Sequence, residues 1–265
     1  MTDHLLIEKK DGIATLIMNR PESRNALSLE MRQSLFEVMT EIETDDAIRC
    51  VVIKGAGDHF MAGGDLKAFG EIVKQAPDER RKQFEARIHN LHPTMFTMRR
   101  MRKPIIASVQ GAAAGFGLSL AMACDMVIAA DNAFFTLAYI NIATTPDGSG
   151  TYSLARMVGL KKAMEIAMLG DRFDAKEAAR LGLVNFVVPT ADIEAETAKL
   201  AKRLASGPTV AIGRTKQMLH ASLTNSMETQ LAIEAENFAA CAATEDWAEG
   251  ITAFGEKRKP VFKGK

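Results

Sequence analysis

The sequence has few cysteines and none of the cysteine patterns that mark disulfide frameworks or zinc sites. Cys50, Cys124 and Cys241 are widely separated, and no two of them form a CxxC pair. An odd number of isolated cysteines is typical of a reducing compartment, so we expect a cytoplasmic protein. We expect no metal site either, because His89 and His92, three residues apart, have no third ligand near them in the sequence.

The chain also lacks a net charge and any long apolar run. Lys plus Arg and Asp plus Glu number 33 each, so nothing favours nucleic acid or an anionic membrane as a partner. No uninterrupted apolar stretch reaches the roughly 18 residues of a membrane span. The first residues, MTDHLLIEKKDG, lack the apolar core of a secretory signal. With 47% apolar and 25% charged residues, the composition is that of a globular enzyme or binding protein.

Strands and helices alternate over the first 190 residues. Asp11-Gly12 lies between two short apolar segments, Leu5–Lys9 and Ile13–Met18, and predicts a hairpin. Ser28 is the expected N-cap of a helix over Leu29–Thr44. Further strands are expected at Cys50–Ile53, Ile105–Val109 and Met126–Ala130, and further helices at 78–102 and Gly117–Ala123.

After Pro189 the periodicity is helical almost to the end of the sequence. The predicted helices are Ala191–Ala205, Thr209–Ala221, Met227–Ala242 and Asp246–Lys257. The sequence therefore predicts two regions, an α/β core over residues 1–190 that carries the site and an all-helical region over 191–265. We expect the helical region to cover the site and to pack between subunits.

Two glycine-rich turns follow buried strands. Phe60–Leu66 comes after the strand at Cys50–Ile53, and Gln110–Gly117 comes after the strand at Ile105–Val109. The glycines of the second turn, at 111, 115 and 117, do not have the G-x-G-x-x-G spacing of a dinucleotide site. Glycine-rich backbone lets a ligand approach closely, and a helix N-terminus offers free N–H donors. One N–H from each turn would form an oxyanion hole.

Several segments together resemble the enoyl-CoA hydratase/isomerase (crotonase) superfamily. They are NRPESRNAL at 19–27, FMAGGDL at 60–66, QGAAAGFG at 110–117, PDGSG at 146–150, AARLGLV at 178–184 and the stretch 253–260. The resemblance implies an α/β fold, a crotonase-like spiral of ββα units with an all-helical C-terminal trimerisation region. It also implies a homotrimer or a dimer of trimers that acts on an acyl-CoA thioester. No separate cofactor is expected, since coenzyme A is part of the substrate.

The resemblance assigns candidate site residues by motif position. The oxyanion donors are the amides of Gly64 and Phe116. Arg24 and Lys257 are placed near coenzyme A phosphates, the latter in some relatives across a subunit boundary, although either one alone could equally be a surface charge. The predicted substrate-binding set also contains backbone groups for adenine and pantetheine and the end of the FMAGGDL motif, namely Ala26, Ala62, Asp65 and Leu66.

The reaction is indicated by a departure from the family pattern. Hydratases of this family carry two glutamates, and those positions match Ser119 and Tyr139, neither of which is a carboxylate. The ordinary pKa of tyrosine, about 10, does not suit acid–base work near neutral pH. Asp147, which on its own reads as a turn aspartate, matches the acidic residue of the isomerase branch, including the ring-oxepin isomerases of phenylacetate degradation. Because one base suffices to move a double bond, we expect a Δ3-Δ2 enoyl-CoA isomerase.

Other functions remain open. The same aspartate position is the nucleophile of the 4-chlorobenzoyl-CoA dehalogenase branch, where His92 and Tyr139 match a histidine and a tryptophan. We rank the isomerase first, an atypical hydratase or CoA-thioester hydrolase second and a dehalogenase third, with a non-catalytic acyl-CoA binder as the alternative to an enzyme. The acyl pocket is expected within residues 67–100, with candidate walls at Met61, Met95 and Met98.

Overall fold

The computed structural model describes residues 3–265 and contains two β-sheets. The larger sheet has the strand order β1-β2-β3-β4-β6-β9, in which β1 and β2 are antiparallel and all other neighbours are parallel. Its strands are β1 (Leu5–Lys10), β2 (Ile13–Met18), β3 (Cys50–Gly55), β4 (Ile105–Val109), β6 (Met126–Ala130) and β9 (Phe186–Val188). The smaller sheet, in the order β5-β7-β8, consists of β5 (Ala112–Ala114), β7 (Phe134–Thr136) and β8 (Phe173–Asp174). The predicted α/β class is confirmed.

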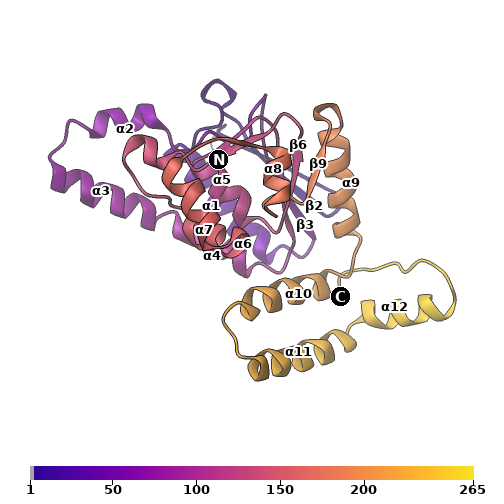
Figure 1. Cartoon of the computed structure of the whole chain (residues 1–265). Helices are drawn as coiled ribbons and strands as arrows, with labels where there is room; N and C mark the ends of the chain where they lie inside the picture. Colours follow the sequence, from indigo (N-terminus) through magenta and orange to yellow (C-terminus); the bar gives the residue numbers. More distant parts are fainter. Residues whose placement is uncertain (1–2) are drawn as a thin grey trace.

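Helices surround the two sheets and continue beyond them (Figure 1). In the core they are α1 (Leu29–Thr44), α2 (Leu66–Ile72), α3 (Pro77–His89), α4 (His92–Arg100), α5 (Phe116–Ala123), α6 (Gly150–Val158), α7 (Leu160–Leu169) and α8 (Ala175–Arg180). The C-terminal helices are α9 (Ile193–Ala205), α10 (Thr209–Ser222), α11 (Met227–Ala242) and α12 (Glu245–Gly255). Short 3-10 turns occupy η1 (Pro21–Ser23), η2 (Tyr139–Ile142) and η3 (Thr190–Asp192). Within residues 3–265, no helix is long and apolar enough to cross a membrane.

Local sequence chemistry accounts for the N-terminal elements. Asp11 and Gly12 have φ values of 52° and 76°, the left-handed pair that a type I′ hairpin turn requires. The hairpin register pairs Lys10 with Ile13 across this turn. Ser28 caps α1 as predicted, because its Oγ accepts a hydrogen bond from the Met31 amide at 3.0 Å.

The helix predicted over 78–102 is in fact two helices, α3 and α4. The prediction was wrong because Pro93 lies inside the predicted span and cannot donate the hydrogen bond that the carbonyl of His89 would accept. Instead α3 ends at His89, and Pro93 lies in the first turn of α4, where a missing N–H has no cost. The break brings the end of α3 and the beginning of α4 to the same side of the core.

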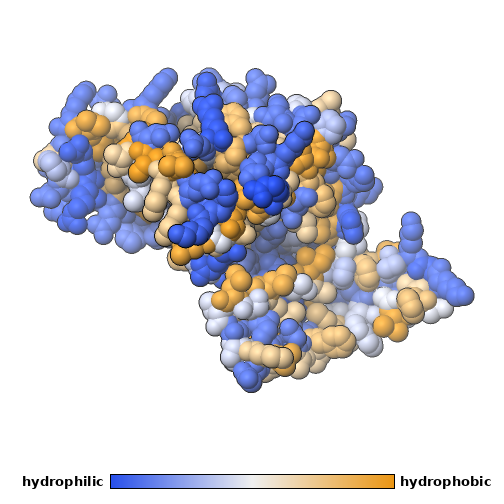
Figure 2. Space-filling model, in the orientation of Figure 1, coloured by the Kyte–Doolittle hydropathy of each residue, from blue (hydrophilic) through white to orange (hydrophobic). Residues whose placement is uncertain are grey.

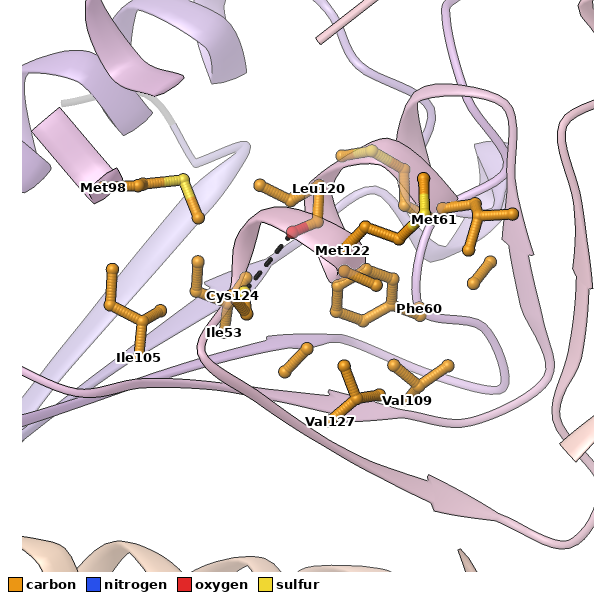
Figure 3. Packing of buried hydrophobic residues seen from close by; sticks show 14 of the residues in the cluster. Ile53, Phe60, Met61, Met98, Ile105, Val109, Leu120, Met122, Cys124 and Val127 are labelled. Carbon is orange, nitrogen blue, oxygen red and sulfur yellow. Dashed lines mark hydrogen bonds between the residues drawn. The ribbon is translucent and has the colours of Figure 1, made fainter. Parts of the chain in front are cut away.

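The main hydrophobic core lies against β3, β4 and β6 and extends around α5 (Figure 3). Cys124, at the end of α5, is buried there, and its Sγ lies 3.4 Å from the Leu120 carbonyl. Met61 and Met98 also belong to this core, with relative exposures of 0% and 1%, and Met95 is buried as well. Met61 and Met98 pack against other apolar side chains of this core. The prediction that they form walls of the acyl pocket is therefore not supported.

The last helices form a lobe that projects from the core (Figure 1). The prediction of four helices in this region is confirmed in number, although the last one ends at Gly255 and leaves Lys257 outside it. The boundary between residues 190 and 191 stays a prediction: α9, on its C-terminal side, packs on the large sheet through Ile193, Ala201 and Ala205. In Figure 2 apolar side chains cover much of the lobe formed by α10, α11 and α12, and a hollow separates that lobe from the core.

Candidate active site

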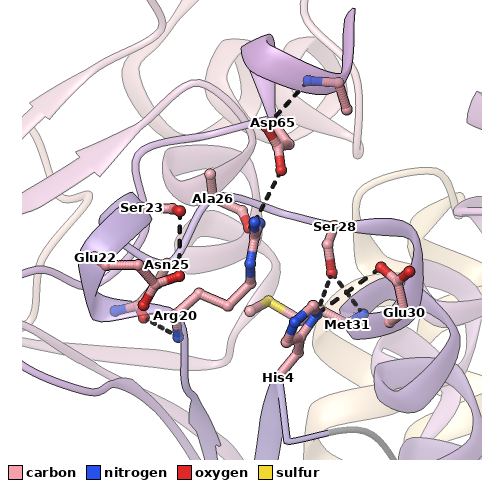
Figure 4. A network of polar contacts seen from close by, with 11 residues as sticks. His4, Arg20, Glu22, Ser23, Asn25, Ala26, Ser28, Glu30, Met31 and Asp65 are labelled. Carbon is pink, nitrogen blue, oxygen red and sulfur yellow. Dashed lines mark hydrogen bonds and ion pairs between the residues drawn. The ribbon is translucent and has the colours of Figure 1, made fainter.

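A polar network holds together the loops that lead into the site (Figure 4). Arg20, just after β2, donates from Nη1 to the Ala26 carbonyl at 2.7 Å and from Nη2 to Oδ2 of Asp65 at 3.0 Å. Asn25 is fully buried, and its side-chain amide donates to the carbonyls of Ala56 and His59. These contacts fix the loop at 20–27 against the loop at 56–65. Both loops carry motifs singled out in the sequence.

The two glycine-rich turns pack directly against each other. Gly63 has a φ of 99°, and a Cβ on it would lie 3.1 Å from the Ala114 carbonyl and 3.7 Å from the Phe116 nitrogen. A glycine is therefore required at 63, both for its backbone conformation and for the close approach of the second turn. Within residues 3–265, neither the Gly64 amide nor the Phe116 amide donates a hydrogen bond. The fold thus places two unoccupied donors on adjacent turns, the second at the start of α5.

Both donors line a cavity of about 500 Å³ that also contains Asp147. The Asp147 carboxylate accepts a hydrogen bond at Oδ1 from the hydroxyl of Tyr139, at 2.5 Å. Ser119, buried in α5, lies 3.4 Å from the same hydroxyl through its Oγ. Asp147, the base expected from the sequence, therefore lies beside Ser119 and Tyr139, the residues at the two positions matched to the hydratase glutamates. Within the described chain, Oδ2 of Asp147 forms no hydrogen bond or ion pair with another residue.

The turn after Asp147 packs against the side chain of Phe116, whose amide is the second donor. Gly148 has a φ of 56°, and a Cβ on it would lie 2.5 Å from the Phe116 ring. No other residue fits this position without displacing the ring. Gly148 thus lies between Phe116, which supplies an amide donor, and Asp147, which supplies the carboxylate.

The surroundings of Asp147 and Tyr139 raise the pKa of both groups. Burial raises the pKa of Asp147, and the hydrogen bond from Tyr139 and the charge of His92 oppose this rise. Burial also raises the pKa of Tyr139, and the nearby Asp147 charge raises it further. Tyr139 therefore stays protonated and donates, and the carboxylate of Asp147, when ionised, is a stronger base than that of an exposed aspartate.

His92, the first residue of α4, lines the same cavity. Its ring centroid lies 5.2 Å from that of His89 and 6.2 Å from that of Phe96. His92 forms no hydrogen bond or ion pair with any residue of the part of the chain that the structure describes. It shares the cavity with Asp147, and its charge acts on that carboxyl without a hydrogen bond between them.

The residues predicted to bind coenzyme A have different surroundings. Arg24 is exposed, with its backbone in a left-handed conformation (φ 52°), and its carbonyl accepts from the Ala62 amide at 2.9 Å. The Ala62 carbonyl accepts no hydrogen bond within residues 3–265, whereas the amide and carbonyl of Ala26 are both engaged. Lys257 is exposed, outside the cavity wall.

The two remaining predicted residues begin α2. Asp65 is the N-cap of this helix, accepting from the Ala68 amide at 3.3 Å, and also pairs with Arg20. Leu66, the first residue of α2, is 53% exposed and lines the cavity. The pattern of Asp65 followed by a helix was available in the sequence as a capping signal, but α2 itself was not predicted.

The individual side chains that α2 and α3 contribute to the cavity wall were not identified from the sequence. The side chains in question are Phe69, Phe84, Arg87 and Ile88, together with Arg32 from α1. Their stretch, 67–100, was expected to form the pocket, and five of its residues besides His92 do line the cavity, with Leu91 as the fifth. No local signal distinguishes these side chains from solvent-exposed ones, because the helices are short and polar.

Comparison with known proteins agrees with this geometry. The family model described as enoyl-CoA hydratase/isomerase matches residues 8–265. A 1,2-epoxyphenylacetyl-CoA isomerase of Escherichia coli is 36% identical over the full length of both chains. A 4-chlorobenzoyl coenzyme A dehalogenase of an Arthrobacter species is 30% identical, covering 96% of this chain and 91% of its own. The crystal structure of an enoyl-CoA hydratase from a Polaromonas species superimposes with a TM-score of 0.91 at 36% identity, covering 98% and 99% of the two chains. The predicted crotonase-like fold is confirmed.

Proposed function

The chain belongs to the enoyl-CoA hydratase/isomerase family, and we propose that within this family it is a Δ3-Δ2 enoyl-CoA isomerase. The supporting observation is that a single half-buried carboxylate, Asp147, shares one cavity with the amides of Gly64 and Phe116, which donate to no other described residue. The two positions at which relatives carry glutamates hold Ser119 and Tyr139. A double-bond shift needs one base, whereas hydration needs groups that both hold and split a water molecule.

The proposed reaction uses the two backbone amides and the carboxylate that line this cavity. The amides of Gly64 and Phe116 donate to the thioester oxygen and stabilise the negative charge of the enolate. Asp147 accepts the proton from the carbon next to the thioester through Oδ2, since Oδ1 is bonded to Tyr139. The double bond moves one position toward the thioester, and the proton is delivered to the carbon two positions farther along the chain. Asp147 ends the cycle ionised, and no other reactant is consumed.

Substrate binding is proposed to follow the motif positions. Arg24 and Lys257 would meet coenzyme A phosphates, and the free Ala62 carbonyl, with the backbone near Ala26, would meet adenine and pantetheine. Asp65 acts by holding the first glycine-rich turn, and Leu66 packs beside the thioester. Coenzyme A arrives with the substrate, so we propose no separate cofactor.

The proposal is tested with a panel of 3-enoyl-CoA thioesters in deuterated water, followed by mass spectrometry and NMR. We expect deuterium at the carbon that receives the proton and no gain of oxygen, and no turnover by Asp147→Asn. Addition of water to the product would instead indicate a hydratase. If the wild-type protein binds CoA esters but converts no 3-enoyl-CoA, the isomerase assignment is lost and an acyl-CoA binder remains.

A second candidate, a dehalogenase-like activity, is favoured by one observation. His92 lines the same cavity as Asp147, and its charge lowers the pKa of that carboxyl. In such a reaction Asp147 would attack a halogenated ring and His92 would activate water. Release of chloride from 4-chlorobenzoyl-CoA, abolished by His92→Gln, would favour this candidate over the isomerase.

We also propose that the protein assembles as a homotrimer or a dimer of trimers. Helix α11 has no buried residue although it carries Met227, Leu231 and Phe238, and Phe254 of α12 is 87% exposed. Contiguous apolar side chains of this kind are covered by another chain in stable oligomers. Light scattering of the wild-type protein and of Phe238→Glu tests the proposal, with a smaller particle expected for the variant.

A further inference from the structure

Two arginine side chains line the active-site cavity without a carboxylate partner. Arg32 lies in the second turn of α1 and Arg87 lies near the end of α3, and both are half-buried. Arg32 donates from Nη1 to the Arg87 carbonyl at 3.0 Å, which keeps the two residues adjacent. Within residues 3–265, neither guanidinium group forms an ion pair. Partial burial removes some of the hydration of both guanidinium groups, and a bound anion would replace part of what they lose.

The position of Arg87 relative to the oxyanion donors is defined by Phe69. The Arg87 Cζ atom lies 5.0 Å from the centroid of the Phe69 ring. The edge of the same ring lies 3.0 Å from the place where a Cβ on Gly64 would stand. Phe84 packs edge-to-face against Phe69, with 5.0 Å between the ring centroids. Arg87 is thus one aromatic ring away from the donor that holds the thioester oxygen in the proposed function.

No neighbouring carboxylate among the described residues neutralises the positive charge of Arg87 in an ion pair. Burial lowers the pKa of Arg87, and the positive charge of Arg32 lowers it further. The carboxylates of Asp65 and Glu30 act in the opposite direction, but each has another partner. Asp65 is bonded to Arg20 at 3.0 Å, and Glu30 lies 3.8 Å from the ring nitrogen of His4. An anion bound between the two guanidinium groups would relieve both their mutual repulsion and their loss of hydration.

We propose that Arg32 and Arg87 form an anion subsite for a carboxylate at the far end of the acyl chain. The preferred substrates are then coenzyme A thioesters of dicarboxylic acids. Guanidinium groups match the geometry of a carboxylate, which accepts paired hydrogen bonds from them. The apolar rings of Phe69 and Phe84 contact the methylene groups between the two ends of the acyl chain. The inference rests on the proposed function, because it takes this cavity as the acyl pocket.

A phosphate of coenzyme A is the other anion that the two arginines could meet. The phosphates are separated from the thioester by the whole pantetheine arm, whereas Arg87 is one ring away from Gly64. The exposed Arg24 lies in the loop at 20–27, before α1, and offers a cation outside the pocket wall. The position of the subsite therefore favours the acyl carboxylate.

The test compares saturated acyl-CoA pairs of equal chain length by calorimetry, so that no turnover is needed. The pairs are succinyl with butyryl, glutaryl with pentanoyl, and adipyl with hexanoyl-CoA, and free coenzyme A is measured in parallel. We expect at least one diacid to bind the wild-type protein about 10-fold more tightly than its partner, as for a hydrogen-bonded charge pair. Arg87→Met and Arg32→Met should each remove this preference while the monoacid affinity stays the same.

The matched control is Arg81→Met, an exposed arginine on the same helix α3 that forms no ion pair in the described chain. It should leave the diacid preference unchanged, and thermal melts identify any variant that fails to fold. If Arg87→Met and Arg32→Met weaken the binding of diacid, monoacid and free coenzyme A equally, the arginines bind a phosphate of coenzyme A. That result would overturn the proposal. No diacid preference in the wild-type protein would also overturn it. Neither result depends on isomerase turnover, so failure of the proposed function is detected separately, by the experiment in deuterated water.

Discussion

The hydroxyl of Tyr139 donates to Oδ1 of Asp147 at 2.5 Å, and this contact decides which groups are left for chemistry. It uses one carboxylate oxygen, and the other forms no hydrogen bond with another residue of the described chain. It also keeps Tyr139 protonated, because burial and the neighbouring charge both raise the pKa of the phenol. Tyr139 therefore acts as a hydrogen-bond donor to Asp147 and not as an acid or base of its own.

Removal of this hydrogen bond should move the pH dependence of catalysis. In Tyr139→Phe the ionised form of Asp147 loses a donor, so the pKa of the carboxyl should rise by about one unit. The acidic limb of kcat/KM should then shift to higher pH. Ser119→Ala is the control, since Ser119 contacts the tyrosine hydroxyl but not the carboxylate. An unchanged pH profile for Tyr139→Phe would mean that Asp147 is not the group that titrates.

Asp147→Asn should be more stable to heat than the wild-type protein at neutral pH. The folded-state pKa of Asp147 is raised by burial, so the folded protein binds this proton more tightly than the unfolded chain does. Stability from this group is therefore greatest at low pH and decreases as pH rises through the unfolded and then the folded pKa. The difference in Tm between the two proteins should be roughly 2 °C or more at pH 8 and should vanish near pH 3. A wild-type protein that is the more stable of the two at pH 8 would contradict this.

Gly148→Ala should reduce turnover without preventing binding. The added methyl group would stand 2.5 Å from the Phe116 ring, and the residue would be held at a φ of 56°. Displacement of Phe116 or Asp147 from their relative positions should lower kcat by about 100-fold, the scale of losing one oxyanion donor. Gly159→Ala provides the matched control, because Gly159 has a φ of 76° but no heavy atom within 4 Å of an added Cβ. If the two substitutions lower kcat equally, the backbone strain at a positive φ, and not the contact with the Phe116 ring, causes the loss of turnover.

Asp65 combines two roles that substitutions can separate. Asp65→Asn keeps an N-cap for α2 but removes the ion pair with Arg20, whereas Asp65→Ala removes both. We expect Asp65→Ala to be less stable than Asp65→Asn by about 1 kcal/mol in chemical unfolding. Both should raise KM for CoA esters, since the pair ties the first glycine-rich turn to the loop that contains Arg24. Equal free energies of unfolding for the two variants would show that the Asp65 side chain does not stabilise α2 as its N-cap.

Several features followed from the sequence because they depend on neighbouring residues. The hairpin turn at Asp11-Gly12 and the Ser28 cap of α1 were predicted, the first with a strand that is one residue longer in the structure. The two glycine-rich turns indicated backbone donors through their residue types and spacing alone. The absence of a second carboxylate among the matched positions is likewise a property of the sequence, and the isomerase proposal rests partly on it.

Other features depended on contacts between distant segments. The break between α3 and α4 follows from Pro93, which the helical periodicity of 78–102 concealed. The burial of Met61 and Met98 in the core could not be distinguished from a pocket wall, since both environments are apolar.

The proposed oxyanion hole illustrates both kinds of feature. The sequence determined that Gly64 and Phe116 each belong to a glycine-rich turn, because glycine spacing is a local property of the chain. Only the tertiary structure decided that these amides are free, that Asp147 and Tyr139 face them, and that Arg32 and Arg87 line the same cavity. Those relationships join residues from α1, α3, α5 and the loop before α6, and they exist because the parallel sheet and its core bring these elements to one place.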